Sequence, residues 1–129
     1  MKLLLDAHVL LWVLYEPERL AARARNAITD ESNELFVSLA TLWEIVNKAA
    51  THRLPLAGSS LERIVERIEE LGVAFVFILQ SEIVAAAMLP RHHTDPFDRI
   101  LIAQAKAHSL TLVTVDADIM LYDVTTLWQ

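Results

Sequence analysis

Short apolar runs alternate along this chain with longer segments that have helical periodicity. Each run is brief and uncharged, as expected for strands that are buried on both faces. Alternation of strands and helices favours a parallel sheet, because each helical crossover returns the chain to the same edge. We therefore predict an α/β fold, a three-layer α/β/α domain with a parallel central sheet. The predicted strands cover residues 3–5, 35–37, 74–79, 110–115 and 124–127.

The predicted helices have recognisable boundary residues. Asp95 before Pro96 is a favourable start, because the carboxylate caps free N–H groups and proline fits the first turn. Ser59 with Glu62 forms a capping-box pattern, and Gly72 closes that helix. The predicted helices cover residues 9–14, 18–29, 39–51, 59–71, 81–89 and 95–108, with a loop at 53–58.

The composition narrows the chemistry that is open to this chain. Its 129 residues suit one domain, 1–129, and a hydrophobic fraction of 54% excludes a disordered protein. The absence of cysteine excludes disulfides, thiolate metal sites and cysteine nucleophiles. The formal net charge of −6 does not supply the basic surface of most nucleic-acid binders. A nucleic-acid substrate would therefore have to be attracted by a bound cation or a local basic rim.

Two apolar stretches could be mistaken for targeting or membrane segments. Met1–Leu5 begins like a signal peptide, but Asp6 and His8 interrupt it too early. Residues 71–90 approach the length of a membrane span, but Glu82 lies within that stretch. We expect a cytoplasmic protein with no membrane association.

Four acidic residues are predicted to meet at one edge of the sheet. Asp6 and Asp116 follow predicted strands, Asp98 lies in the first turn of a helix, and Glu44 lies on a polar helix face soon after a strand. Ligands of open parallel sheets bind at the carboxyl ends of the strands. Each acid also has a structural explanation when taken alone, as a helix cap, a partner of the helix dipole or a solvated side chain.

Converging carboxylates repel one another. At about 5 Å and an effective dielectric constant near 20, each ionised pair costs about 3 kcal/mol. Such a cluster requires a cation or must hold protons through raised pKa values. Oxygen ligands alone suit Mg²⁺ or Mn²⁺, which can bind a phosphate and activate water. The acids therefore predict metal-dependent phosphoryl chemistry.

Four segments of the chain resemble PIN-domain ribonucleases and, among these, the VapC toxins of bacterial type II toxin–antitoxin pairs. One segment is residues 92–99, and its most specific part is Asp-Pro-Phe-Asp-Arg at 95–99, followed by Leu-Ile-Ala-Gln-Ala at 101–105. The other segments are residues 3–12, 37–45 and 112–116. They occur in the order and spacing of the family and cover nearly the whole chain.

This resemblance implies a PIN-like domain and a Mg²⁺- or Mn²⁺-dependent endoribonuclease that leaves 5′-phosphate and 3′-hydroxyl ends. By position, its catalytic acids are Asp6, Glu44, Asp98 and Asp116, and the metal ligands among them are Asp6, Asp98 and Asp116. The resemblance also implies a homodimer and an antitoxin protein that inserts a basic residue into the pocket. Many relatives have Thr or Ser where this chain has Ala7, which removes a supporting hydroxyl.

Several further residues are candidates for supporting roles. The candidate accessory residues at the metal site are Asp95, Asp118, Thr114 and Ser38. The candidate RNA contacts, each close in sequence to a pocket acid, are Lys48, Arg91, Arg99 and His93. The basic residues could instead be ordinary surface charges, and the pair His92-His93 could instead supply a metal ligand or a proton shuttle.

Two other functions remain open. A non-catalytic PIN-like module that binds RNA or protein is expected to lack one of the acids, and none is missing here. A phosphatase could use Asp6 as a covalent nucleophile. That chemistry commonly places a second Asp two residues further on, where this chain has His8.

Overall fold

The computed structural model describes residues 1–51 and 60–129, so the predicted loop 53–58 and the predicted cap Ser59 lie outside the described residues. Its centre is a five-stranded sheet of order β3-β2-β1-β4-β5, and all four neighbouring pairs are parallel. The predicted α/β fold with a parallel central sheet is confirmed. The strands are β1 (Lys2–Leu5), β2 (Glu34–Ser38), β3 (Ala74–Val76), β4 (Thr111–Val113) and β5 (Thr126–Leu127).

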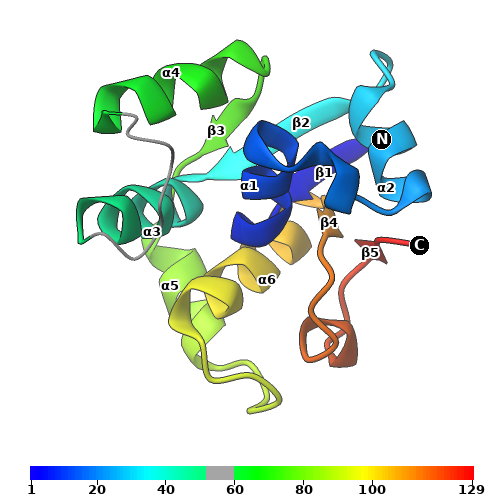
Figure 1. Ribbon diagram of the computed structural model, residues 1–129. Helices are drawn as coiled ribbons and strands as arrows, with labels where there is room; N and C mark the ends of the chain where they lie inside the picture. Colours follow the sequence, from blue (N-terminus) through cyan, green and yellow to red (C-terminus); the bar gives the residue numbers. More distant parts are fainter. Residues whose placement is uncertain (52–59) are drawn as a thin grey trace.

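Helices connect the strands (Figure 1). No helix within the described parts of the chain is long and apolar enough to cross a membrane. The α-helices are α1 (Ala7–Tyr15), α2 (Ala22–Thr29), α3 (Leu39–Ala50), α4 (Leu61–Glu70), α5 (Gln80–Ala87) and α6 (Pro96–His108), and the 3₁₀ turns are η1 (Pro17–Arg19) and η2 (Ile119–Leu121).

Strand β1 is buried from both sides. Because side chains alternate along a strand, Leu3 and Leu5 face one way and Leu4 faces the other. Leu3 and Leu5 belong to the core cluster that includes residues of α1, α2, α3 and α4, whereas Leu4 packs with Leu101 and Ile102 of α6. This distribution confirms the three-layer arrangement.

Three strands, β3, β4 and β5, are shorter than predicted, whereas β1 and β2 are longer than predicted by one and two residues. The predicted strand 74–79 ends at Val76, because its only neighbour, β2, ends at Ser38 in register with Val76. Beyond Val76, β2 offers no further strand residues to pair with, and Phe77 is exposed. Strand β4 likewise ends at Val113, opposite Leu5 at the end of β1. The residues beyond both ends are therefore free to build a site.

Several helix starts also differ from the predictions: α1 begins two residues earlier than predicted and α5 one residue earlier. The predicted helix 18–29 is divided, because Leu20 is extended and buried in the core, so that η1 ends before it and α2 begins after it. Ser60 caps α4 by accepting a hydrogen bond from the backbone N–H of Arg63 at 3.1 Å. Gly72 has a positive φ of 76° just after α4, as expected for a glycine that ends a helix.

A buried acid joins α5 to α6. Glu82 is only 3% exposed, and its carboxylate accepts hydrogen bonds from the backbone N–H of Leu79 (3.0 Å), the Gln104 amide (3.2 Å) and His108 Nε2 (2.7 Å). Burial by itself would raise the pKa of Glu82. The three donors outweigh burial and hold this pKa below its ordinary value.

The lowered pKa of Glu82 predicts a pH-dependent contribution to stability. The ionised carboxylate stabilises the fold above its unfolded pKa, and this contribution is lost as the pH falls through its lower folded pKa. We expect Glu82→Gln to reduce the free energy of unfolding at pH 7 by about 1–3 kcal/mol. Urea denaturation should show this deficit shrinking below about pH 4.5, the ordinary pKa of glutamate. Exposed Glu66→Gln is the control and should change little, whereas a Glu82→Gln deficit that is constant with pH would contradict this account.

Candidate metal centre

The four predicted catalytic acids lie on elements that meet at the carboxyl edge of the sheet. Asp6 directly follows β1, and Asp116 lies three residues after the end of β4, the strand that pairs with β1. Glu44 lies on α3, which follows β2 directly, and Asp98 lies in the first turn of α6. The parallel topology therefore directs all four toward one side of the molecule, as predicted.

Asp6 is both a helix cap and a buried acid. Its Oδ1 accepts a hydrogen bond from the backbone N–H of Val9 at 2.9 Å, which confirms the alternative that it caps a helix. Burial raises the pKa of Asp6, against the opposing effect of hydrogen bonds from Thr114 and Val9, and the nearby charge of Asp116 raises it further. A cation bound near Asp6 would therefore favour the ionised carboxylate and lower its pKa, while the side chain continues to cap α1.

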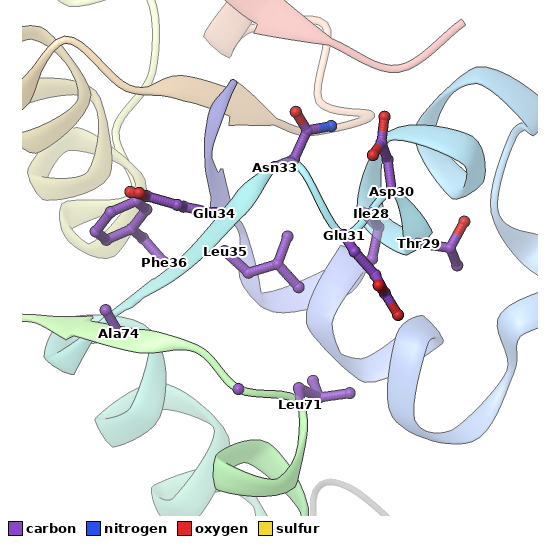
Figure 2. Close-up of a pocket in the computed structure, with 11 residues that line it drawn as sticks. Ile28, Thr29, Asp30, Glu31, Asn33, Glu34, Leu35, Phe36, Leu71 and Ala74 are labelled. Atoms are coloured by element: carbon purple, nitrogen blue, oxygen red, sulfur yellow. The ribbon is translucent and has the colours of Figure 1, made fainter.

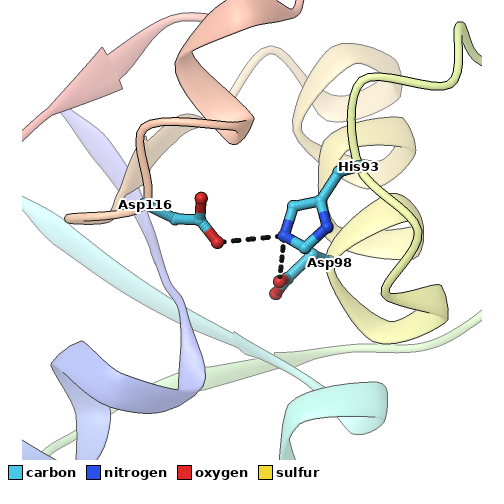
Figure 3. Close-up of side chains that lie close together, drawn as sticks. All are labelled: His93, Asp98 and Asp116. Carbon is cyan, nitrogen blue, oxygen red and sulfur yellow. Dashed lines mark hydrogen bonds and ion pairs between the residues drawn. The ribbon is translucent and has the colours of Figure 1, made fainter.

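Asp98 and Asp116 share one histidine nitrogen. His93 Nε2 lies 2.9 Å from Asp98 Oδ2 and 2.9 Å from Asp116 Oδ2 (Figure 3). Among the described residues, these three form the one group whose potential ligand atoms all lie within 4.8 Å of one another. His93 Nδ1 accepts a hydrogen bond from the backbone N–H of Asp95 at 3.2 Å, so in the neutral ring the proton is on Nε2 and points at the two carboxylates.

Unbalanced negative charge surrounds Asp98. Burial raises the pKa of Asp98 to about 7, with further contributions from the carboxylates of Asp95, Asp6 and Glu44, while His93 opposes the rise. The pKa of His93 is raised in turn: burial lowers it, but the hydrogen bond to Asp116 and the charge of Asp98 outweigh burial. Each group therefore stabilises the charged form of the other.

Glu44 has a cationic partner of its own. Lys48, one helical turn further along α3, places its Nζ 2.7 Å from Glu44 Oε2. The Glu44 carboxyl group is nearly buried, whereas the Lys48 side chain is partly exposed. Lys48 therefore neutralises part of the negative charge at the edge of the site and also remains accessible to a substrate.

The donor set fits a hard divalent cation. Asp98 and Asp116 bring carboxylate oxygens close together, and the charges of Asp6 and Glu44 act on Asp98. Burial is the main cause of the raised pKa values of Asp6 and Asp98, and repulsion from neighbouring carboxylates adds to it; a divalent cation would favour the charged form of both groups. Oxygen donors suit Mg²⁺ and Mn²⁺.

The candidate accessory residues divide into supports and caps. Thr114 is buried and accepts a hydrogen bond from the backbone N–H of Asp116 at 3.1 Å, while its hydroxyl also bonds to Asp6. Asp95 caps α6 and Ser38 caps α3, each by accepting backbone N–H groups of its own helix. Asp118 is exposed, and its backbone N–H donates to Asp116 Oδ1 at 2.8 Å. Thr114 is therefore the polar side chain that bridges two of the acids.

The candidate RNA contacts differ in their exposure to solvent. Arg91 is exposed in the loop before His93, and Lys48 is partly exposed beside Glu44. Arg99 is only 4% exposed, and its guanidinium bonds to oxygens of the protein. Proximity in sequence to Asp98 does not make its side chain accessible, so the prediction that Arg99 contacts RNA is wrong.

Tyr122 was not among the residues predicted from the sequence. Its hydroxyl donates to the carbonyl of Pro90 at 2.6 Å and accepts the backbone N–H of His93 at 2.9 Å. Tyr122 lies at the end of η2, in a segment without helical or strand periodicity. No sequence signal therefore marked it.

A second acidic region lies away from this centre. A cavity of about 490 Å³ opens near the amino end of β2, where Asp30, Glu31 and Glu34 contribute to its lining (Figure 2). Asp30 hydrogen-bonds to the side chain and backbone of Ser32, and these bonds lower its pKa.

Comparisons with known proteins agree with this geometry. The family model described as PIN domain matches residues 3–125. The chain is 34% identical over 117 residues to Ribonuclease VapC22 of Mycobacterium tuberculosis, an alignment that covers 88% of this chain and 85% of that protein.

Solved structures share the fold. The structure of VapBC2 from Rickettsia felis bound to a DNA fragment from their promoter matches with a TM-score of 0.72 at 12% identity and covers 100% of both chains. FitAcB from Neisseria gonorrhoeae matches with a TM-score of 0.65 at 23% identity and covers 97% of this chain and 96% of that chain. Identities this low support the fold alone.

Removing the charge of Asp98 should stabilise the metal-free protein near neutral pH, whereas removing the charge of Glu82 should destabilise it. Since the folded pKa of about 7 exceeds the ordinary value of 3.8, this group costs stability as the pH rises between these two values in metal-free protein. We expect Asp98→Asn to raise the Tm at pH 8 by about 3–8 °C and to weaken the stabilisation by Mn²⁺. Melting curves at pH 5 and pH 8, with and without Mn²⁺, test both effects.

The control for this experiment is Glu31→Gln, an exposed acid at the opposite edge of the sheet, which should leave the Mn²⁺ response intact. An Asp98→Asn variant that gains no more stability at pH 8 than at pH 5, or that keeps the full Mn²⁺ response, would refute the assignment.

Proposed function

Because the chain belongs to the PIN-domain family, we propose that it is a metal-dependent endoribonuclease and the toxin component of a type II toxin–antitoxin pair. The observation that carries the proposal is the convergence of Asp98, Asp116 and Asp6 at the carboxyl edge of the sheet. In this proposal residues 1–129 form a single PIN domain that acts on RNA in the cytoplasm.

Asp6, Asp98 and Asp116 would hold Mg²⁺ or Mn²⁺, which when bound polarises a phosphoryl group and lowers the pKa of a bound water. Glu44 accepts a hydrogen bond from the attacking water and directs it at phosphorus, with Lys48 holding the carboxylate in place. Attack in line breaks the bond from phosphorus to the 3′ oxygen and leaves 5′-phosphate and 3′-hydroxyl ends. The attacking water releases one proton to solvent, and the departing 3′ oxygen takes one up from solvent.

Local positive charge offsets the net charge of −6 in binding RNA. Lys48 and His93 lie against the acids, and Arg91 is exposed in the loop before His93. These three are the proposed phosphate contacts, whereas Arg99 is buried and is excluded from this set. Binding that depends on few phosphate contacts should depend only moderately on salt concentration. The bound cation supplies the remaining attraction.

The proposed protein partner is a cognate antitoxin. The surplus negative charge around Asp98 favours a basic side chain that enters the site from another protein. Such a side chain would compete with the metal ion for the same carboxylates. Inhibition would then follow from occupation of the site.

We also propose a homodimer formed through an apolar face on α5. We define this face as Ile83 and Val84 within α5, together with Phe77 and Leu79 just before the helix and Met88 just after it. All five are exposed, Val84 by 59% and Met88 by 80%. Apolar residues clustered in this way commonly mark an interaction surface.

The main alternative is a non-catalytic module that binds RNA or protein. All four acids of the catalytic pattern are present, and Asp98 has the raised pKa expected of a metal site without its ion, so we favour the enzyme.

Metal-dependent cleavage is the direct test of this function. We expect purified protein, free of antitoxin, to cut structured RNAs in Mg²⁺ or Mn²⁺ and to stop in excess EDTA. Asp6→Asn should lower kcat/KM by at least about 100-fold, since removal of a direct ligand should exceed the 10–100-fold cost typical of groups that only support ligands. Asp30→Asn, an exposed acid at the opposite edge, is the matched control. Cleavage that persists in EDTA would contradict the metal mechanism, and binding of Mn²⁺ without cleavage would favour the non-catalytic module.

The homodimer has a separate test. Val84→Glu places a charge on the apolar face of α5 and should convert a dimer to a monomer in sedimentation velocity experiments. Leu121→Glu, an equally exposed apolar position on η2, is the control and should remain dimeric. A wild-type protein that sediments as a monomer, or a Val84→Glu variant that remains a dimer, would rule out this surface.

A further inference from the structure

Arg99 is a buried arginine that is not paired with a carboxylate anywhere in residues 1–51 and 60–129. Six protein oxygens instead lie 2.8–3.4 Å from its two terminal nitrogens. Burial of a guanidinium is costly unless its donors are satisfied. The structural role of Arg99 is therefore indicated by the oxygens to which it donates hydrogen bonds and by the segments that carry them.

One terminal nitrogen of Arg99 binds the end of α5. Its Nη2 donates to the carbonyls of Ala86 (2.8 Å), Ala87 (3.4 Å) and Leu89 (2.9 Å). Carbonyls at the end of a helix lack partners within the helix, and a basic side chain satisfies both their hydrogen bonds and the helix dipole. This contact attaches α6 firmly to the end of α5.

The other terminal nitrogen binds the His93 loop, which we define as residues 90–95. Arg99 Nη1 donates to the carbonyls of Pro90 (2.9 Å) and His93 (3.1 Å) and to the hydroxyl of Tyr122 (3.2 Å). The Tyr122 hydroxyl donates to Pro90 and accepts the backbone N–H of His93. The backbone of His93 is thus held at both its N–H and its C=O.

This anchoring determines where the imidazole lies. The Asp95 N–H fixes Nδ1, and Nε2 lies 2.9 Å from both Asp98 and Asp116. Hydrogen bonds of this length weaken steeply when the groups move apart, and site geometry tolerates displacements of only about 0.5 Å. Loss of the anchor should therefore disturb both carboxylates.

We propose that Arg99 and Tyr122 are positioning residues for the candidate metal centre: they hold the His93 loop so that His93, Asp98 and Asp116 keep the spacing required to bind the cation. Tyr122 and Arg99 touch neither the carboxylates nor a substrate in this role, and they act through the backbone of the loop. The consequence for RNA cleavage rests on the proposed function, whereas the consequence for metal binding does not.

Tyr122→Phe is the sharpest test, because it keeps the buried ring and removes one hydroxyl with three hydrogen-bonded contacts. Tyr15→Phe is the matched control: its hydroxyl is buried and has no hydrogen-bond partner among the described residues, and its ring packs against the other core cluster. Isothermal titration of the full chain with Mn²⁺ should give an affinity about tenfold weaker or more for Tyr122→Phe and an unchanged affinity for Tyr15→Phe.

A second readout needs no metal. In nuclear magnetic resonance spectra of metal-free wild-type protein, the Nε2 proton of His93 should exchange slowly with solvent, and it should exchange faster in Tyr122→Phe and in Arg99→Lys. Arg99→Lys keeps the charge but cannot span both groups of oxygens. Unchanged Mn²⁺ affinity and unchanged exchange in Tyr122→Phe would overturn the proposal.

These results separate the two proposals. Wild-type protein that binds Mn²⁺ but does not cut RNA contradicts the proposed function, and the Tyr122→Phe affinity still decides the positioning role. If the wild-type protein does not bind Mn²⁺, the role of Arg99 and Tyr122 in cation binding is contradicted together with the metal-dependent function. Wild-type protein that cuts RNA, together with a Tyr122→Phe variant of equal affinity and equal exchange, contradicts the positioning role alone.

Discussion

Repulsion among carboxylates at one edge of the sheet is the constraint on which the rest of this site depends. Burial and neighbouring acids raise the pKa of Asp98 to about 7, and burial also raises the pKa of Asp6. Two intramolecular cationic partners offset part of this repulsion, because Lys48 pairs with Glu44 and His93 lies between Asp98 and Asp116. The remaining imbalance is what a divalent cation would relieve.

The topology of the fold brings the acids together, and other residues hold the surrounding segments in place. Parallel pairing of β1 with β4 sends Asp6 and Asp116 out of the sheet at the same edge. Asp6 is itself buried and caps α1, but other residues support the part of the site around His93. Arg99 and Tyr122 join the end of α5, the loop before α6 and η2 into one hydrogen-bonded unit. Residues outside the group of acids therefore hold one side of the site in place.

Features that depend on hydrophobic periodicity or on helix-capping residues could be predicted from the sequence. Alternating apolar runs predicted the parallel sheet, the strand ends located Asp6 and Asp116, and the pair Asp95-Pro96 located the start of α6. The lengths of β3, β4 and β5 were overestimated; the end of β3, for example, depends on the length of its neighbour β2 and not on local hydrophobicity.

The supporting residues could not be predicted for a different reason. The direction of the Arg99 side chain is set by tertiary contacts, so its position next to Asp98 suggested an RNA contact that burial excludes. Tyr122 acts through a hydroxyl that meets the His93 loop only in the folded chain, across about thirty residues of sequence. Hydrogen bonds between distant segments leave no periodic trace.

The central claim is that these acids form one cation site at the carboxyl edge of the sheet. The most direct measurement is an anomalous difference map from crystals of the protein grown with Mn²⁺. The account predicts a peak among the carboxylates of Asp6, Asp98 and Asp116. A map without a peak at that position, or with its peak beside Asp30, Glu31 and Glu34 at the opposite edge, would contradict it.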